Sequence, residues 1–203
     1  MSEHYFTSQP GAEHKPLCFK ATLRDREYTF HTDAGVFSKD EIDLGSKILI
    51  ESLPANLGET VLDLGCGYGP VGMVAASLVN DHGRVYLVDV NERAVDLANK
   101  NIKANKISNA QASVSDGLQN LAGYKFDNII TNPPIRAGKK VIYPMLADAY
   151  DALKPGGCLF VVIRTKQGAK SLESHLQGLS GDCSTIQKKS GFRVLKCCKP
   201  PST

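Results

Sequence analysis

The residues best able to do chemistry stand in the run Thr131-Asn132-Pro133-Pro134-Ile135, at the end of a predicted strand. Two consecutive prolines fix φ and remove two backbone donors, so the turn presents its oxygens rigidly. An exocyclic amine on a base is a poor nucleophile because its lone pair is delocalised into the ring. If the Asn132 side-chain oxygen and the Pro133 carbonyl each accept one amine hydrogen, the lone pair faces an electrophilic methyl group. The turn therefore predicts an amine-methylating site that works mainly by positioning.

A glycine-rich loop upstream predicts a nucleoside cofactor. A buried strand over 60–64 runs into a turn that contains Gly65, Gly67 and Gly69, and then into a helix. Glycines turn with positive φ and let the backbone approach a ligand closely. Asp63 precedes the first glycine, where a carboxylate would repel a pyrophosphate but could hold an ammonium group. The loop therefore favours S-adenosylmethionine, whose amino-acid tail is cationic.

The same loop leaves a rival cofactor open. The segment Gly67–Gly72 fits the dinucleotide pattern G-x-G-x-x-G, and Asp89 follows at about the expected 20 residues. Asp89 ends the next predicted strand and would accept hydrogen bonds from the ribose hydroxyls of either cofactor. At the end of the third predicted strand, Ser115-Asp116-Gly117 offers an acceptor for an adenine amino group, or a plain turn. A nicotinamide-dependent oxidoreductase is thus an alternative, although it gives the Asn-Pro-Pro turn no role.

Strands and helices that alternate along the chain must position these residues, a pattern typical of a parallel sheet. Short β-rich runs predict strands over 60–64, 84–89, 110–115, 126–131 and 157–163. Helical spacing predicts helices over 40–53, 71–78, 92–105, 140–153 and 170–179. Two hairpins are expected, one at 17–32 and one at 184–198. Ligands bind at the carboxyl ends of the strands in such sheets, which is where Asp89 and Asn132 stand.

Composition narrows the class of protein without naming a partner. The 24 Lys and Arg residues against 21 Asp and Glu give a formal charge of +3, which permits an RNA partner without requiring one. The first residues lack a basic segment followed by an apolar run, and no stretch approaches the ~20 apolar residues that span a bilayer. Six cysteines without a C-x-x-C pair are expected to be reduced thiols, and no metal site is expected. A cytoplasmic protein is predicted.

The motifs occur in a characteristic order: Gly35–Ser38, Asp63–Gly69, Asp89, Thr131–Arg136 and Thr165–Ala169. Together they resemble the small-domain class I methyltransferases that are similar to the catalytic half of bacterial small-subunit ribosomal RNA guanine-N2 methyltransferases. The resemblance implies an α/β fold, a Rossmann-like doubly wound sheet of seven strands with an antiparallel last strand. With the expected hairpin at 17–32, the chain is divided into an N-terminal extension with a short β-hairpin over residues 1–35 and a methyltransferase domain over residues 36–203.

The motifs themselves and the resemblance together assign roles to particular residues, and Arg136, Lys139 and Arg164 are assigned from their positions after predicted strands. S-adenosylmethionine, released as S-adenosylhomocysteine, would be held by Asp63, Gly65, Cys66, Gly67, Gly69, Asp89, Val90, Ser115, Asp116 and Asn132. Amine methylation would take place at Asn132, Pro133, Pro134 and Ile135. The predicted substrate-binding residues, whose basic members would contact RNA phosphates, are Phe37, Arg136, Lys139 and Arg164.

Ile135 stands where many amine-methylating relatives carry an aromatic residue that stacks on the flipped base. This departure lowers adenine N6 and protein glutamine as candidate substrates and favours guanine N2 in ribosomal RNA. The expected partner is therefore RNA, either ribosomal RNA or a small ribosomal subunit. A non-catalytic binder of cofactor or RNA is a further alternative, although the intact Asn132-Pro133 pair disfavours it. His31 is expected to be a structural histidine rather than a general base.

Overall fold

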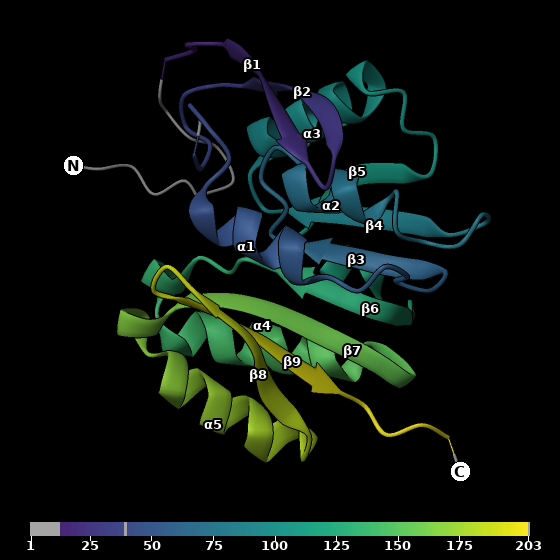
Figure 1. The fold of residues 1–203 in the computed structure, drawn as a ribbon, viewed down its shortest axis with the longest axis vertical. Helices are drawn as coiled ribbons and strands as arrows, with labels where there is room; N and C mark the ends of the chain where they lie inside the picture. The colour runs from purple at the N-terminus through teal and green to yellow at the C-terminus, as the bar shows by residue number, and fades with distance from the viewer. Residues whose placement is uncertain (1–12, 39, 203) are drawn as a thin grey trace.

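The centre of the molecule is a seven-stranded sheet in the order β5-β4-β3-β6-β7-β9-β8 (Figure 1). The computed structural model describes residues 13–38 and 40–202. The strands are β3 (Thr60–Leu64), β4 (Arg84–Asp89), β5 (Ala110–Val114), β6 (Phe126–Thr131), β7 (Leu153–Arg164), β8 (Cys183–Lys189) and β9 (Phe192–Cys198). Strands β3 to β7 pair in parallel, whereas β9 is antiparallel to both β7 and β8. The predicted doubly wound α/β sheet with an antiparallel last strand is confirmed.

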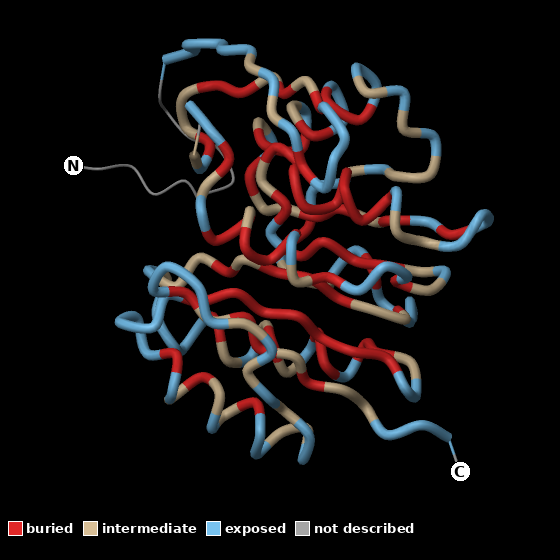
Figure 2. The backbone as a smooth tube through the Cα atoms, in the orientation of Figure 1, coloured by how far each residue is buried: buried red, intermediate tan, exposed pale blue. Residues whose placement is uncertain are grey.

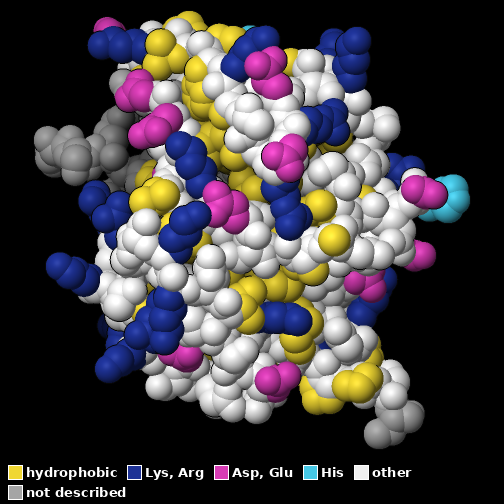
Figure 3. Space-filling model, viewed as in Figure 1, with side chains coloured by type: hydrophobic (Ala, Val, Ile, Leu, Met, Phe, Trp, Pro, Cys, Tyr) yellow, Lys and Arg dark blue, Asp and Glu magenta, His cyan; other side chains and the backbone are white. Residues whose placement is uncertain are grey.

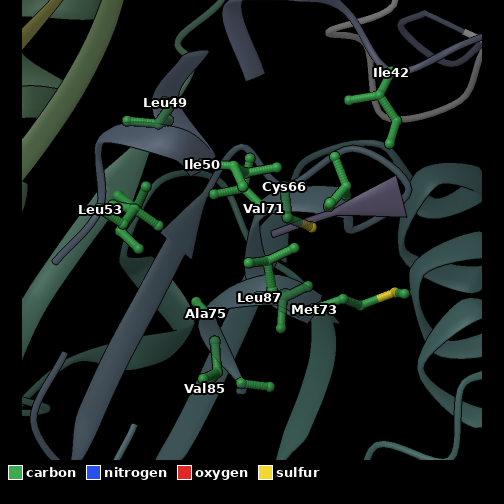
Figure 4. Packing of buried hydrophobic residues seen from close by; sticks show 14 of the residues in the cluster. Ile42, Leu49, Ile50, Leu53, Cys66, Val71, Met73, Ala75, Val85 and Leu87 are labelled. Carbon is green, nitrogen blue, oxygen red and sulfur yellow. The ribbon is translucent and has the colours of Figure 1, made fainter. Parts of the chain in front are cut away.

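Helices cover both faces of the sheet. They are α1 (Leu44–Ser52), α2 (Pro70–Ala75), α3 (Glu92–Ala104), α4 (Lys139–Asp151) and α5 (Ala169–Ser180), with short 3-10 turns η1 (Gln119–Leu121), η2 (Ile135–Ala137) and η3 (Thr165–Gln167). Alternate strand residues feed two apolar clusters: one packs against α1, α2 and α3, and the other against α4 and α5. Figure 2 shows the buried residues concentrated along the strands. Figure 4 shows part of the first cluster, including Leu49, Ile50, Cys66, Val71, Met73 and Leu87.

Helix α1 begins later than the sequence pattern predicts. The predicted helix covered 40–53 with an earlier cap, whereas the helix spans Leu44–Ser52. Asp43 is its N-cap: the backbone there is extended, with ψ 152°, and the carboxylate accepts a hydrogen bond from the Ser46 N–H. A carboxylate in this position satisfies one of the unpaired donors of the first turn. The predicted helix start was therefore wrong.

Strand β7 begins earlier than predicted. The predicted strand covered 157–163 and the preceding helix was extended to residue 153, but Leu153 is already the first residue of β7. Leu153 is buried and pairs with Phe126 of β6. Burial in the sheet therefore extends the strand past Pro155 and Gly156, which by themselves indicate a turn. Gly157 lets the strands come close here, because a Cβ at this position would lie 2.7 Å from the Asp127 carbonyl oxygen.

The predicted N-terminal hairpin is present as β1 (Leu17–Leu23) and β2 (Arg26–Thr32). Its turn is tight, since Arg24 and Asp25 both adopt positive φ, at 46° and 63°. This is the conformation of a two-residue turn that matches strand twist. The hairpin packs against α3, where the Asn105 side chain bonds the Thr29 backbone N–H at 2.9 Å. The hairpin thereby extends the apolar core beside α3.

The cysteines differ from the prediction. Disulfides join Cys158 to Cys198 and Cys183 to Cys197, so the prediction of reduced thiols is wrong for these four residues. The reason is register: β9 lies between β7 and β8, and each of its two consecutive cysteines stands directly opposite a cysteine of one neighbour. Cys66 keeps a free thiol, and burial raises its pKa.

None of the helices within residues 13–38 and 40–202 combines the length and apolar character needed to cross a membrane. Over the same residues, no cluster of acidic, histidine and cysteine side chains has the arrangement of a metal site.

Candidate functional site at the carboxyl ends of the strands

A cavity of about 720 Å³ opens at the carboxyl ends of β3, β4, β6 and β7. Its volume is that of a typical site for a small molecule or cofactor. Its lining contains most of the predicted residues: Phe37, Asp63, Gly65, Cys66, Gly67, Asp89, Val90, Ser115, Asp116, Asn132, Pro133, Pro134, Ile135, Arg136 and Arg164. Two predicted residues, Gly69 and Lys139, do not line it. The parallel strands thus bring the glycine loop and the Asn-Pro-Pro turn into one cavity.

The glycine loop lies between β3 and α2 with its open side toward this cavity. Gly65 and Gly67 have positive φ, at 73° and 56°, and a Cβ on either would meet no atom within 4 Å. The loop is held by Val88 of β4, whose carbonyl oxygen accepts hydrogen bonds of 2.9 Å from Gly65 N–H and Cys66 N–H. A ligand can therefore approach the backbone closely at these two glycines.

Gly69 has a packing role instead. It is the residue before α2, with φ 94°, and a Cβ on it would lie 3.3 Å from side-chain atoms of Leu87 and Ala98. Its place in the motif is explained by helix packing rather than by contact with the cavity.

Asp89 is the last residue of β4 and contacts the glycine loop. One carboxylate oxygen accepts a hydrogen bond of 2.8 Å from Gly67 N–H, and the other accepts one of 2.9 Å from Asn91 N–H. Burial raises the pKa of this carboxyl, while the backbone donors of Asn91 and Gly67 oppose that effect. A carboxylate has about four acceptor positions, so these two bonds leave capacity for ribose hydroxyls.

Asp63 lies deeper, at only 2% exposure on β3. Its Oδ2 accepts a hydrogen bond of 2.7 Å from Gly72 N–H at the start of α2. Burial raises the pKa of Asp63 to about 7, the Gly72 bond opposes this rise, and the nearby Asp89 charge adds to it. A cationic group bound beside Asp63 would favour the carboxylate form.

Taken together, the open glycine faces and these two carboxylates fit a nucleoside with an amino-acid tail. Asp116 and the buried Ser115, whose hydroxyl accepts a hydrogen bond of 3.2 Å from Asn120 N–H, complete the far end of the cavity. Carboxylates, a hydroxyl and open backbone suited to a nucleoside thus line one cavity.

The Asn-Pro-Pro turn lines the same cavity at the end of β6. The Asn132 side-chain nitrogen donates to Asp43 Oδ1 at 3.2 Å and to Ser46 Oγ at 3.1 Å. Its amide oxygen is therefore on the side away from this pair. The Pro133 carbonyl already accepts a hydrogen bond of 2.8 Å from Ile135 N–H, which leaves it one further lone pair.

The predicted substrate contacts separate into two groups. Phe37, Arg136 and Arg164 line the cavity, and the Arg164 guanidinium lies 4.9 Å from the centre of the Phe192 ring. Lys139 points elsewhere, because its amino group donates to Ser171 Oγ of α5 at 2.8 Å. Figure 3 shows several Lys and Arg side chains along the left edge of this view, where the parallel strands end. Arg136 and Arg164 are the basic residues that line the cavity among the residues that the structure describes.

Several residues that line the cavity were assigned no site role from the sequence, although two of them lie within the motifs Asp63–Gly69 and Thr165–Ala169. They are Asp43, Ser46, Tyr68, Gln167 and Phe192. The local pattern around Asp43 and Ser46 predicted only a helix. It does not indicate that α1 meets the end of β6. His31 does not line the cavity, and its backbone N–H donates to Asn101 Oδ1 at 2.7 Å. Burial lowers the pKa of the His31 imidazole, and the positive charge of Lys100 lowers it further.

Comparison with known proteins gives a consistent family. The model of the methyltransferase small domain matches residues 27–196. The Bacillus subtilis protein YbxB is 42% identical over 201 residues, which are 98% of this chain and 100% of that one. Ribosomal RNA large subunit methyltransferase G of Yersinia enterocolitica is 32% identical over 203 residues, which are 96% of this chain and 50% of that protein.

A solved structure agrees. The T. thermophilus 16S rRNA N2 methyltransferase RsmC, in complex with AdoMet and guanosine, superimposes with a TM-score of 0.82 at 32% identity. The match covers 94% of this chain and 52% of that one. The chain thus spans about half the length of the ribosomal RNA methyltransferases that it matches and the full length of YbxB.

Proposed function

Because the chain belongs to the methyltransferase small domain family, whose cofactor is S-adenosylmethionine, we propose that it methylates the exocyclic N2 amine of guanine in ribosomal RNA. One observation carries the proposal. The Asn132-Pro133-Pro134 turn lines the same cavity as the glycine loop and Asp89. An acceptor for an amine therefore lines the same cavity as the residues suited to the cofactor.

The chain's own groups divide the binding of the cofactor among them. Gly65 and Gly67 present open backbone, Asp89 accepts from the ribose hydroxyls, and Asp63 offsets the ammonium charge. Asp116 accepts from the adenine amino group at the far end. When bound, S-adenosylmethionine supplies an electrophilic methyl group on a sulfonium. These residues would hold the amino-acid tail and the ribose in the cavity that the Asn-Pro-Pro turn also lines.

The Asn-Pro-Pro turn then positions the amine. The Asn132 side-chain oxygen accepts one amine hydrogen, and the free lone pair of the Pro133 carbonyl accepts the other. Held in this way, the amine nitrogen would keep its lone pair toward the methyl carbon. The nitrogen–methyl bond would form as the methyl–sulfur bond breaks, which leaves neutral S-adenosylhomocysteine, and the proton that the nitrogen loses would pass to solvent water. Positioning of this kind can contribute roughly 7–11 kcal/mol when the geometry is good.

Guanine is the proposed base for two reasons. Ile135 borders the turn with an apolar side chain, where an aromatic residue would favour stacking of a flipped adenine. The T. thermophilus relative, at 32% identity, is named for N2 methylation of 16S rRNA and was solved with guanosine. Arg136 and Arg164 stand at the rim of the cavity, where phosphates of an RNA strand would pass.

The experiment is methyl transfer from radiolabelled S-adenosylmethionine to unmodified transcripts of 16S and 23S ribosomal RNA and to assembled small and large subunits. Labelled product is digested to nucleosides and separated by chromatography. We expect N2-methylguanosine from a 16S substrate. N6-methyladenosine, or label in protein glutamine, would refute the guanine assignment, and the 23S arm tests the choice of subunit.

Replacement of Asn132 by alanine tests the role of the turn. Asn132→Ala should leave cofactor affinity nearly intact and lower turnover by about 100-fold or more, since a preorganised acceptor is lost. The matched control is Asn128→Ala on the same strand, whose side chain bonds the Leu57 carbonyl oxygen outside the cavity. Loss of cofactor binding with unchanged turnover per bound enzyme would contradict the assigned role.

A further inference from the structure

We propose that Asp43 and Ser46 are positioning residues that hold the Asn132 amide with its oxygen toward the substrate amine. This inference rests on the proposed amine methylation at Asn132. It gives the first turn of α1, which is neither part of the glycine loop nor of the Asn-Pro-Pro turn, a role in the reaction.

The geometry decides which end of the amide faces which way. The Asn132 nitrogen lies 3.2 Å and 3.4 Å from the two oxygens of Asp43 and 3.1 Å from Ser46 Oγ. An ionised carboxylate only accepts hydrogen bonds, so the end of the amide that faces Asp43 must be the NH₂ group. The oxygen is then turned to the other side. An amide rotated by 180° would set its oxygen against a carboxylate and present a donor to the hydrogens of the substrate amine.

Asp43 and Ser46, which together form a clamp on the Asn132 amide, are themselves held in place. Asp43 Oδ1 also accepts the Ser46 N–H at 3.1 Å, so the carboxylate is fixed by the helix whose first turn it caps. Ser46 is only 5% exposed. Gly45 lies between them, and a Cβ there would stand 3.0 Å from Asp43 Oδ1 and 2.9 Å from the Phe192 ring. The Asp43-Leu44-Gly45-Ser46 segment thus brings the carboxylate and hydroxyl close to the end of β6.

The kinetic test uses substitutions that preserve the helix. Asp43→Ser keeps an N-cap side chain but removes the two-oxygen carboxylate, and Ser46→Ala removes the second acceptor. We expect the kcat for transfer to RNA to fall about tenfold or more in each, with little change in KM or cofactor affinity. Asp43→Asn, which retains one acceptor oxygen, should keep more activity than Asp43→Ser. The matched control is Ser52→Ala on the same helix, whose hydroxyl bonds the Ile48 carbonyl oxygen outside the cavity.

A double-mutant cycle separates positioning from a merely structural role. If Asp43 acts through Asn132, adding Asp43→Ser to Asn132→Ala should cause no further loss of kcat. A second loss of the same size in the double variant would overturn the proposal, because it would mean that Asp43 acts independently.

A readout besides activity comes from the side-chain amide signals of ¹⁵N-labelled protein. The Asn132 pair is identified by its disappearance in Asn132→Ala. We expect this pair to shift in Asp43→Ser and Ser46→Ala but not in Ser52→Ala, and an unmoved pair would refute the clamp. Wild-type protein that transfers no methyl group to guanine would refute the proposed function instead, while the amide signals would still report on the clamp.

Discussion

Asp63 is a carboxyl group whose protonation is set by its surroundings. It is buried on β3, its Oδ2 accepts the Gly72 N–H, and burial raises its pKa to about 7 against an ordinary value of 3.8. Between these two pH values the folded chain holds a proton that the unfolded chain has lost. Asp63 therefore contributes less to folding stability as the pH rises through this window.

The same residue predicts how cofactor binding depends on pH. An ammonium group bound beside Asp63 favours the carboxylate, so binding should release a proton and affinity should rise between about pH 5 and 7, by at most about tenfold per pH unit. Calorimetry with S-adenosylhomocysteine over this range measures the slope. Asp63→Asn is the control and should flatten it. An equal slope in wild type and Asp63→Asn would assign the titration to another group.

At the scale of elements, the join between β3 and α2 depends on one glycine. Gly72 stands in α2 where a Cβ would lie 2.5 Å from Leu87 side-chain atoms and 2.9 Å from Asp63 Oδ2. Helix α2 can therefore approach the sheet only because this position has no side chain. Gly178, in α5, offers the opposite case, since a Cβ there would meet no atom within 4 Å.

This contrast predicts that alanine substitutions at the two glycines change the free energy of unfolding in opposite directions. Gly72→Ala should lower the free energy of unfolding by about 1–3 kcal/mol through overpacking and should weaken cofactor binding. Gly178→Ala should raise it by about 0.5–1 kcal/mol, because alanine is the better helix former. Urea unfolding monitored by circular dichroism measures both. A neutral Gly72→Ala would show that α2 can shift away from β4 at no cost.

At the scale of the whole molecule, the buried side chain of Asn101 links the N-terminal hairpin to the glycine loop by hydrogen bonds. Asn101 of α3 is fully buried; its oxygen accepts the His31 N–H, and its nitrogen donates to the carbonyls of His31 and Tyr68. Strand β2, helix α3 and the glycine loop meet at this residue. We keep as a proposal the division into an extension over residues 1–35 and a methyltransferase domain over 36–203.

Removal of the Asn101 side chain should lower the stability of the fold. Asn101→Ala leaves buried backbone groups unpaired and should lower the free energy of unfolding by about 1–3 kcal/mol. It should also speed hydrogen exchange at the amides of β2 (Arg26–Thr32). The control is Asn99→Ala on the exposed face of the same helix, whose side chain bonds the Ala112 backbone. Equal effects of the two variants would mean that the Asn101 hydrogen bonds contribute no more than those of an exposed side chain.

The sequence by itself determined the central fold and one wall of the site. The bounds of β3, β4 and β6 were predicted correctly, and with them the placement of the glycine loop, Asp89 and the Asn132 turn. These signals are local: strand composition, glycines and prolines. Because the carboxyl ends of parallel strands meet at one edge of a sheet, local signals were enough to place those residues together.

Only the tertiary structure decided how that wall is completed. Asp43 and Asn132 are 89 residues apart, and their contact depends on how α1 packs across the end of β6. Lys139 follows the turn as Arg136 does, yet it bonds to α5 instead of lining the cavity. The pairing of the cysteines likewise follows from the position of β9 between β7 and β8. Contacts between elements depend on packing and register, which no local pattern of residues specifies.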